Sequence, residues 1–464
     1  MHSLSARSIW IDEGASISFA TLPWRHFLHT LWDYQGNMAL YYLLLRAWIH
    51  LGDSEFAVRS LSVLFGVLTI PAIYFLGARL FDRATGLTAA ILLSVHTFHV
   101  RWSQEARGYS LFILLLVLST YFLVCAMESR PNKGYWIAFT VTAALTFYAH
   151  IFAVFVLAAY ALSIAFPKPY HVATRTIVTV AILFEHLVAP MALFVLLQHS
   201  GSQIAWLPRP SLSGIWEFLL LLTGQGGIWL LVIYLFLCGM VFLRPAGLIH
   251  WDQEKWAVRL LLLWLVLPPM VTLTATPIKR LFYARYMVMC VPALVLLAAR
   301  GLTNLYNGSR ARRWAGASVL ALAVMLSWWG TYRYFANLAE ESTDWRSAVK
   351  YILQNQQPSD GVVVYRAHAL CYGYYVHRSE REHEFAAAPD VLYPPDPGRP
   401  LSRAEIANDT AGRERVWLIL HDERDNPNEL AVVRSALAER FQVQSERAFP
   451  GEILITVVLY GRPR

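Results

Sequence analysis

Long apolar runs recur along the first two thirds of this chain, and no other feature constrains its fold as strongly. A helix needs roughly 20 predominantly apolar residues to span a bilayer, with about 17 as the lower limit. Only 15% of the 464 residues are charged, whereas soluble globular domains average about 25%. The runs and the missing charge together predict a mostly α, polytopic membrane helix bundle of about ten helices.

Ten of these runs are candidate membrane spans. The two runs on either side of His150 fit either two short helices or one long tilted helix. We favour two helices, because the topology then alternates consistently. The candidate spans are Ala57–Leu80, Gly86–Val100, Ser110–Met127, Tyr135–Ala149, Ile151–Pro167, Thr176–Gln198, Ile228–Leu243, Ala257–Ala275, Tyr283–Ala299 and Trp314–Tyr332.

Lysine and arginine are distributed unevenly between the loops on the two sides of these spans. Cytoplasmic loops are enriched in both residues, so the side with thirteen is predicted to be cytoplasmic and the side with six non-cytoplasmic. The net charge of +8 fits this bias and contact with membrane lipids, and we expect no nucleic acid partner. The larger set is Arg79, Arg83, Arg130, Lys133, Lys168, Arg175, Arg244, Lys255, Arg259, Arg300, Arg310, Arg312 and Arg313; the smaller set is Arg101, Arg107, Arg209, Lys279, Arg280 and Arg285.

The non-cytoplasmic face of the membrane is therefore predicted to carry the polar loops. It would hold the N-terminal segment through Asp53, the loops Arg101–Tyr109 and His199–Gly227, the approach to Arg285, and the chain from Arg333 onward. We divide the chain into an outer first loop with interfacial helices (1–56), a transmembrane bundle (57–332) and an outer soluble domain (333–464).

The C-terminal region differs from the rest of the chain, because charges return and prolines cluster at Tyr393–Pro397. Its apolar residues alternate between helical and strand spacing, which predicts a small α/β domain with its own core. The predicted elements are a helix at Asp344–Gln357, strands at Gly361–Tyr365 and Arg415–Leu420, a helix at Glu429–Phe441 and a strand at Ile453–Tyr460.

Two adjacent carboxylates, Asp12 and Glu13, precede an amphipathic stretch at Ser16–Trp32. The ordinary interpretation is a helix cap, because acids favour a helix N-terminus. The alternative is a catalytic carboxylate at the membrane surface. A second amphipathic stretch, Met38–Leu51, carries Tyr41 and Tyr42, is too short to span and is expected to lie in the interface.

Two further predicted outer segments concentrate polar groups. The first holds Glu105, Arg107 and Tyr109 beside Arg101, and ordinary loop solvation is the simpler interpretation. The second runs from Lys279 to Tyr286, on the side where the positive-inside rule disfavours cations. Arg285 opens an apolar run, where its charge needs a partner, and a bound phosphate would be one.

Several short motifs follow one another in an order that resembles the GT-C-fold glycosyltransferases, including the protein O-mannosyltransferases and the aminoarabinose and related bacterial lipid-linked sugar transferases. Each motif alone is weak, and their order and spacing along nearly the whole chain carry the resemblance. The motifs are Ile9-Trp10-Ile11-Asp12-Glu13, Leu40-Tyr41-Tyr42, Glu55 with Arg59-Ser60-Leu61-Ser62, Ser103–Ser110, Tyr148-Ala149-His150, Arg285-Tyr286 with Pro292, and Asp344-Trp345-Arg346.

The resemblance implies transfer of a sugar from a polyprenyl-phosphate donor to a hydroxyl of a lipid, glycan or protein at the outer face of the plasma (inner) membrane, with inversion. Asp12 would be the catalytic base, with Glu13 beside it. Arg107 and Arg285 would hold the phosphate, with Arg101 and Lys279 as further candidates. The substrate-pocket candidates are Glu105, Tyr109, Tyr41, Tyr42, His150 and Tyr286.

The chain departs from the family pattern in three places. Members usually have a transmembrane helix before the Asp-Glu motif, and only eleven residues precede Asp12 here. A histidine that could bind a metal in the family is replaced by Asn37, which leaves a requirement for a divalent metal open. The C-terminal region carries no motif that links it to a defined acceptor.

Two rival classes of function remain. A transporter or flippase of envelope lipids or glycans would use Glu185-His186, which lies midway along a candidate span. The spans show no inverted repeat, so we interpret Glu185 as a paired structural residue. A non-catalytic assembly protein that presents its C-terminal domain would leave Asp12, Glu105 and Arg107 unexplained. Ion flux in proteoliposomes would favour the transporter, and sugar transfer would favour the enzyme.

Overall fold

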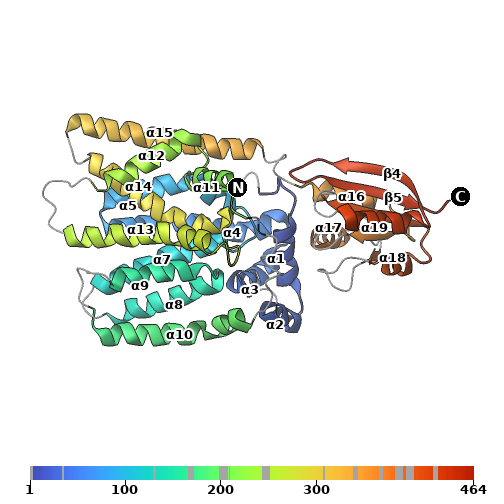
Figure 1. Cartoon of the computed structure of the whole chain (residues 1–464), viewed down its shortest axis with the longest axis horizontal. Coiled ribbons are helices and arrows are strands. Elements are labelled where there is room, and N and C mark those ends of the chain that lie inside the picture. Colours follow the sequence, from blue (N-terminus) through green and yellow to red (C-terminus); the bar gives the residue numbers. More distant parts are fainter. Residues whose placement is uncertain are drawn as a thin grey trace. The chain divides into compact units, whose positions relative to one another are not determined.

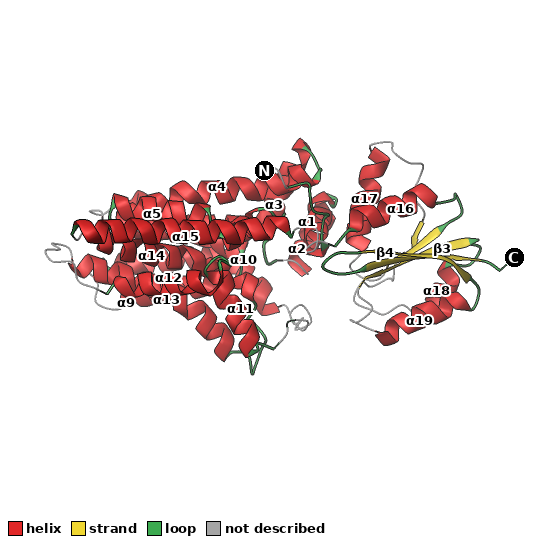
Figure 2. Cartoon of the chain, turned by 90° about the horizontal axis from the view of Figure 1, so that it is seen from above, coloured by secondary structure: helices red, strands yellow, loops and turns green. Residues whose placement is uncertain are grey.

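The structure is a computed structural model, and it describes residues 4–33, 36–128, 132–165, 172–197, 207, 209–242, 251–306, 309–337, 343–364, 369–381, 390–392, 402–421 and 427–463. Arg130, Lys168 and Arg244 of the predicted cytoplasmic set lie outside the described residues, as does the Tyr393–Pro397 cluster. The described chain is mostly helical, with one small sheet (Figures 1 and 2).

The chain forms two compact units. The first, which we call the sheet unit, comprises Met1–Leu22, Ile49–Val58 and Phe335–Arg464; the second, the bundle unit, comprises Pro23–Trp48 and Arg59–Tyr334. These units follow different boundaries from the three predicted ranges. The N-terminal helix groups with the C-terminal domain, because it packs against a helix of that domain.

The N-terminal third begins with short helices. The predicted amphipathic stretch Ser16–Trp32 is two helices, α1 (Ile11–Thr21) and α2 (Trp24–Asp33), because Pro23 lies between them and disfavours a helical conformation at the residue before it. The Met38–Leu51 stretch is α3 (Ala39–Trp48) followed by a 3₁₀ turn, η1 (Ile49–Leu51).

Every predicted span contains helix in the described structure. The bundle helices are α4 (Glu55–Leu80), α5 (Arg83–Ser94), α6 (Thr97–Ser103), α7 (Tyr109–Glu128), α8 (Lys133–Ala149), α9 (Ala153–Ala165), α10 (Thr174–Leu197), α11 (Leu212–Leu222), α12 (Gly227–Met240), α13 (Trp251–Thr274), η3 (Ala284–Cys290), α14 (Val291–Tyr306) and α15 (Arg310–Ala336). Six are long and apolar enough to cross a membrane within the described residues, or up to seven if the bent pair α11 and α12 counts as one span.

Several elements differ from their sequence-based expectations. The Gly86–Val100 run is broken into α5 and α6, so Arg101 lies on a short helix rather than in a loop. The run around His150 is two helices, as favoured, because the backbone is extended at His150. The described part of the predicted loop His199–Gly227 contains the apolar helix α11.

The sheet has the strand order β2-β1-β3-β5-β4. The strands are β1 (Gly361–Val364), β2 (Asp390–Leu392), β3 (Arg415–His421), β4 (Gln442–Phe449) and β5 (Ile455–Gly461). β1 pairs in parallel with β2 and β3, whereas β5 is antiparallel to β3 and β4. The predicted strands correspond to β1, β3 and β5, which are buried apolar runs; the edge strand β4 is mostly exposed and lacks that pattern.

Helices cover both faces of this sheet. Figure 2 shows α16 (Trp345–Asn355) and α17 (Ala369–Arg381) on one face, and α18 (Arg403–Asp409) and α19 (Pro427–Ala438) on the other. Side chains of β3, β5 and α19, including Val416, Leu418, Val458 and Leu437, form a buried core. The region therefore has the core that the sequence predicted for a small α/β domain.

Candidate functional site

Asp12 and Glu13 lie in the first turn of α1 rather than before it. Trp10 is the N-cap residue, and its backbone N–H donates to Glu13 Oε2 at 3.5 Å. Glu13 is fully buried and takes the capping role that the sequence suggested for the pair, whereas Asp12 is half-buried. The positive end of the helix dipole favours a carboxylate at both positions. Capping therefore accounts for Glu13, and the role of Asp12 stays a prediction.

The Asp12 turn is fixed against α17. A Cβ atom at Gly14 would lie 3.3 Å from the backbone nitrogen of Cys371, so a larger residue would have to push the α17 backbone away slightly. The Cys371 thiol is buried, and burial raises its pKa well above the usual value; the neighbouring Glu13 and Asp12 carboxylates raise it further. The thiol is therefore neutral and packs as a small apolar group beside the two acids.

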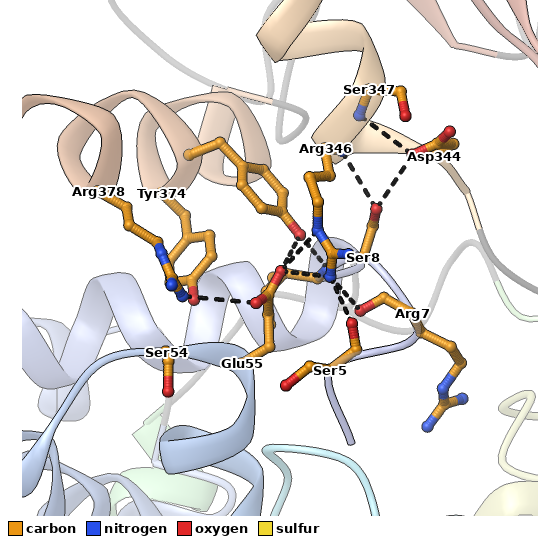
Figure 3. A network of polar contacts seen from close by, with 12 residues as sticks. Ser5, Arg7, Ser8, Ser54, Glu55, Asp344, Arg346, Ser347, Tyr374 and Arg378 are labelled. Atoms are coloured by element: carbon orange, nitrogen blue, oxygen red, sulfur yellow. Dashed lines mark hydrogen bonds and ion pairs between the residues drawn. The ribbon is translucent and has the colours of Figure 1, made fainter. Parts of the chain in front are cut away.

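A polar network joins the three segments of the sheet unit (Figure 3). Glu55, only 6% exposed, accepts hydrogen bonds at Oε1 from Arg346 Nη2 at 2.7 Å and from the Tyr375 hydroxyl at 2.9 Å. Its Oε2 pairs with Arg378 Nη1 at 3.4 Å. The Tyr375 hydroxyl in turn accepts the backbone N–H of Ile9 at 2.8 Å, three residues before Asp12.

The same network continues through the start of α16. Asp344 caps this helix by accepting the Ser347 N–H at 3.1 Å. The Ser8 hydroxyl donates to Asp344 Oδ1 at 3.4 Å and accepts the Arg346 N–H at 3.1 Å. Arg346 also donates to the Ser5 carbonyl at 2.7 Å. The segment that leads into Asp12 is therefore held at several points by charged and polar side chains of the C-terminal domain.

In the bundle unit, the turn before α7 packs on α3. Arg107 Nη1 donates to the Tyr42 hydroxyl at 3.1 Å, and the Arg107 carbonyl accepts the Ser62 hydroxyl at 3.2 Å. Ser62 also bonds to the Tyr41 hydroxyl at 2.8 Å. A side chain at Gly108 would lie 3.2 Å from Tyr41 Cβ, so the turn sits close to the helix. Tyr41 and Tyr42 thus hold the Arg107 turn in place.

A continuous series of ring contacts joins three of the predicted substrate-pocket residues, Tyr109, His150 and Tyr286, to Trp102. The ring centroids of Trp102 and Tyr109 are 4.8 Å apart, those of Tyr109 and His150 5.9 Å, and those of His150 and Tyr286 5.6 Å.

Guanidinium groups lie at both ends of this series. Arg285 stacks 4.7 Å from the Tyr283 ring centroid and 5.9 Å from that of Tyr286. Arg101 stacks 5.5 Å from the Trp102 ring. We call the residues Trp102, Tyr109, His150 and Tyr286 with Arg101, Arg107 and Arg285 the aromatic cluster.

His150 is the centre of this cluster. It lies in the turn between α8 and α9, is 1% exposed, and its Nδ1 accepts the Phe152 N–H at 3.2 Å. Its Nε2 has no hydrogen-bond partner among the described residues. Burial and, to a smaller extent, the nearby positive charge of Arg107 together lower the pKa of His150 to about 3. The ring is therefore neutral, and with Nδ1 accepting, Nε2 carries a hydrogen that can be donated to a ligand.

The structure does not join every predicted site residue to this cluster. Lys279 is exposed, and no hydrogen bond, ion pair or ring contact links it to the cluster. Glu105 is buried in the turn and its carbonyl accepts the Arg107 N–H at 2.7 Å. Asn37 accepts the Ile151 N–H at 3.1 Å and so fixes the backbone beside His150. Across the described chain, no three His, Cys, Asp or Glu side chains gather as a metal site.

Glu185 was expected to be a paired structural residue, and this expectation is wrong for the described structure. Glu185 and His186 are exposed on the surface of α10, and no described side chain pairs with Glu185. Helix α10 packs against α8 through its other face, where Val188, Met191 and Phe194 are buried. Sequence periodicity does not show which face of an apolar helix packs against another helix, so the exposure of Glu185 could not be predicted.

Sequence reasoning also missed the roles of Arg346, Tyr375 and Arg378. Glu55 and Arg346 were noted only as parts of motifs, although they pair across 291 residues of sequence. Glu55 is an acid at the first position of a long apolar helix, which the helix dipole alone would explain. No local pattern indicates its partner.

Residues 38–197 match a family described as dolichyl-phosphate-mannose-protein mannosyltransferase. ArnT from Cupriavidus metallidurans in the apo state matches with a TM-score of 0.63 at 12% identity, over 98% of this chain and 95% of that chain. The same protein bound to undecaprenyl phosphate matches with a TM-score of 0.59 at 12% identity, again over 98% and 95%.

The archaeal oligosaccharyltransferase AglB from Archaeoglobus fulgidus, in complex with an inhibitory peptide and a dolichol-phosphate, matches with a TM-score of 0.54 at 10% identity, over 95% of this chain and 69% of that chain. No curated protein matches the chain by sequence. At such low identities the structural matches show the fold alone.

Proposed function

We propose that this chain, a GT-C-fold membrane glycosyltransferase of the protein O-mannosyltransferase and aminoarabinose transferase type, transfers one sugar from a polyprenyl-phosphate carrier to an acceptor hydroxyl. Two of the structures with this fold contain undecaprenyl phosphate and dolichol-phosphate, which supports a lipid-linked donor. The acceptor belongs to the class of lipid, glycan or protein hydroxyls.

The aromatic cluster carries this proposal. We assign binding of the donor phosphate to Arg107 and Arg285. A planar guanidinium can donate two parallel hydrogen bonds to two oxygens of one phosphate. Both are held in place by tyrosines, Arg107 through the Tyr42 hydroxyl and Arg285 by stacking on Tyr283. The buried Nε2 of His150, with no partner among the described residues, adds a neutral donor at the same place.

Asp12 is the group we assign as general base. The acceptor oxygen would form a bond to the anomeric carbon while the bond from that carbon to the phosphate oxygen breaks, and the acceptor proton would pass to the Asp12 carboxylate. Polyprenyl phosphate leaves as a stabilised anion, so the reaction needs cations and no general acid. A single displacement of this kind inverts the anomeric configuration, whereas retaining enzymes form a covalent intermediate and use two carboxylates.

The non-cytoplasmic face of the plasma membrane is the proposed location of the polar loops and the C-terminal domain. The bias of Lys and Arg toward the opposite loops supports it. A membrane-impermeant thiol reagent tests the orientation in intact cells with single cysteines placed beside Asp12, Arg107 and Arg312. We expect labelling at the first two positions and protection at the third; the reverse pattern would contradict the orientation.

The activity itself is tested by two measurements. Mass spectrometry of envelope lipids and glycans, with and without the chain, should show loss of one sugar from one class of molecule. The purified chain in lipid should then transfer that sugar from a polyprenyl-phosphate donor. Unchanged envelope glycans together with substrate-driven ion flux in proteoliposomes would instead support a transporter.

A further inference from the structure

Helix α10 presents one face that the other described residues leave uncovered. It is the least buried of the six candidate spans in the described structure. Only 17% of its most apolar 18-residue stretch is buried against the rest of the fold. In Figure 1 it lies at the edge of the bundle unit. Glu185 and His186 lie on the exposed side about halfway along Thr174–Leu197, which places them near the centre of a bilayer.

Polar groups at this depth require partners, because hydrocarbon offers none. On translocon-insertion scales, a charged side chain at the centre of a membrane helix makes the free energy of insertion about 2.5–3.5 kcal/mol less favourable. His186 Nδ1 lies 2.7 Å from the Ile182 carbonyl, which can only accept, so Nδ1 carries the hydrogen. Nε2 is therefore left for a second hydrogen bond, and a carboxyl group such as that of Glu185 is a complementary partner for it.

The two groups cannot satisfy each other within one chain, but their placement suits a second copy. At 100° per residue, Ile182 and Ala189 mark the midline of the exposed face, and Glu185 and His186 lie about 50° to either side of it. Copies inserted in the same orientation face each other across a two-fold axis along the membrane normal. In such a pair, a group on one side of the midline meets the group from the opposite side of the other copy.

The flanking residues suit close contact between helices. Val178, Ile182 and Leu193 are 50%, 48% and 48% exposed, and they would bury against their counterparts. Ala189 is exposed and small, and small residues let membrane helices approach closely. Interhelical hydrogen bonds then contribute to the association, because the alternative for each group is hydrocarbon.

We infer that the exposed face of α10 is the interface of a homodimer, in which the Glu185 carboxyl of each copy hydrogen-bonds to His186 Nε2 of the other. The pairing is symmetric, so one contact forms twice and no further copies are recruited by it. The inference is independent of the sugar-transfer proposal, because none of its residues belongs to the aromatic cluster or to the Asp12 turn.

Cysteine crosslinking tests the interface in membranes that contain the full chain. Ile182→Cys should form a disulfide between copies under mild oxidation, because Ile182 lies on the proposed midline. Val188→Cys is the matched control on the same helix; its side chain is 8% exposed and faces α8, so it should not crosslink. Equal crosslinking at both positions, or a crosslink to a different protein in place of a second copy, would overturn the inference.

A swap of the two polar residues tests the pairing. Single-molecule photobleaching of labelled chains in liposomes measures the dimer fraction against chain density. Glu185→Leu and His186→Leu should each raise the dissociation constant about tenfold, given two symmetric bonds at typical interhelical strength. The double variant Glu185→His, His186→Glu keeps one acid and one base on opposite sides of the midline, so it should return within about threefold of the parent.

Three outcomes would contradict the pairing: a parental chain that is monomeric at every density, single variants that dimerise as the parent does, or a double variant as weak as the single ones. Each variant replaces a surface side chain of α10, and size-exclusion chromatography in detergent reports whether it is folded.

Discussion

The two regions that carry the proposed chemistry are stabilised in different ways. Around Asp12, the sheet unit uses charged hydrogen bonds, with Glu55 satisfied by Arg346, Arg378 and Tyr375. Around His150, the bundle unit uses aromatic rings that pack at centroid distances of 4.8–5.9 Å. The first region fixes a backbone; the second surrounds a polar atom that has no partner among the described residues.

This difference indicates how work is divided between the two regions. A network whose acceptors are already occupied holds its elements in one geometry and has little capacity left for a ligand. In the aromatic cluster the buried Nε2 of His150 has no partner among the described residues, so we expect this region, rather than the Glu55 network, to receive the donor phosphate. We therefore expect substitutions in the first network to change local stability and substitutions in the cluster to change donor binding.

The largest effect is expected at Asp12, the one residue of the sheet unit to which we assign a chemical step. Asp12→Asn keeps the shape and remains compatible with the helix start, but it cannot accept a proton usefully. A general base typically contributes 10²–10⁴-fold, so turnover should fall at least about a hundredfold with folding intact. Transfer of a radiolabelled sugar by the purified variant measures this loss.

Glu13→Gln is the control for Asp12, because Glu13 is buried and caps α1. Glutamine retains an acceptor for the Trp10 N–H, so the loss of turnover should be much smaller. Near-normal transfer by Asp12→Asn would remove the catalytic assignment, and the Asp12 turn would then be purely structural.

The second largest effect is expected at Arg285, and it tests whether the aromatic cluster binds the donor phosphate. Arg285→Ala should reduce transfer by about 10–100-fold, which corresponds to the loss of a charge-assisted hydrogen bond. Arg285→Lys retains the charge without the planar fork, so its loss should be intermediate. Steady-state kinetics with varied donor concentration makes the measurement, and Lys279→Ala, at an exposed residue outside the cluster, is the matched control.

The third effect tests whether the network around Glu55 stabilises the local fold. Glu55→Gln removes the charge that pairs with Arg346 and Arg378, and these arginines are 42% and 27% exposed. Solvent reduces the effect from that of a fully buried pair, so we expect about 2 kcal/mol less local stability. Hydrogen exchange of the α16 and α17 amides in the full chain measures this free energy.

Glu439→Gln is the matched control for Glu55→Gln. The pair Arg403–Glu439 is separated by 3.5 Å, and its side chains are 62% and 58% exposed. An exposed pair contributes little, so the change should stay within about 0.5 kcal/mol. If both variants behave alike, the Glu55 network has no special structural role.

The smallest effect is expected at His150, and pH separates its two possible roles. Burial lowers the pKa of His150 to about 3, so the ring stays neutral above pH 5 and should not titrate during transfer. His150→Asn should raise the KM for the donor about threefold through the altered hydrogen bond. The pH profiles of the parent and the variant should have the same shape between pH 5 and 8. An inflection near pH 6.5 that disappears in the variant would instead make His150 an acid or a base.

Much of the fold could be predicted because its signals are local. The length of an apolar run shows whether it can span a bilayer. The strands β1, β3 and β5 are short apolar runs that can be recognised without knowing which strands they pair with. The break at Pro23 and the exposed edge strand β4 were not predicted, because the amphipathic pattern continues through the proline and an edge strand needs no apolar face.

The candidate site was predicted only in part. Arg107, Tyr109, His150, Tyr286 and Arg285 were singled out by motif order, and the structure brings them together. Their roles stay predictions.

The sequence by itself determined a membrane-spanning helix bundle with a C-terminal α/β domain, because apolar length and alternation are properties of neighbouring residues. Only the tertiary structure decided that Glu55 meets Arg346 across 291 residues, that Glu13 rather than Asp12 caps α1, and that Glu185 faces outward. Such pairings depend on which faces pack together over long distances. Because many different pairings satisfy the same local pattern, the pattern does not choose among them.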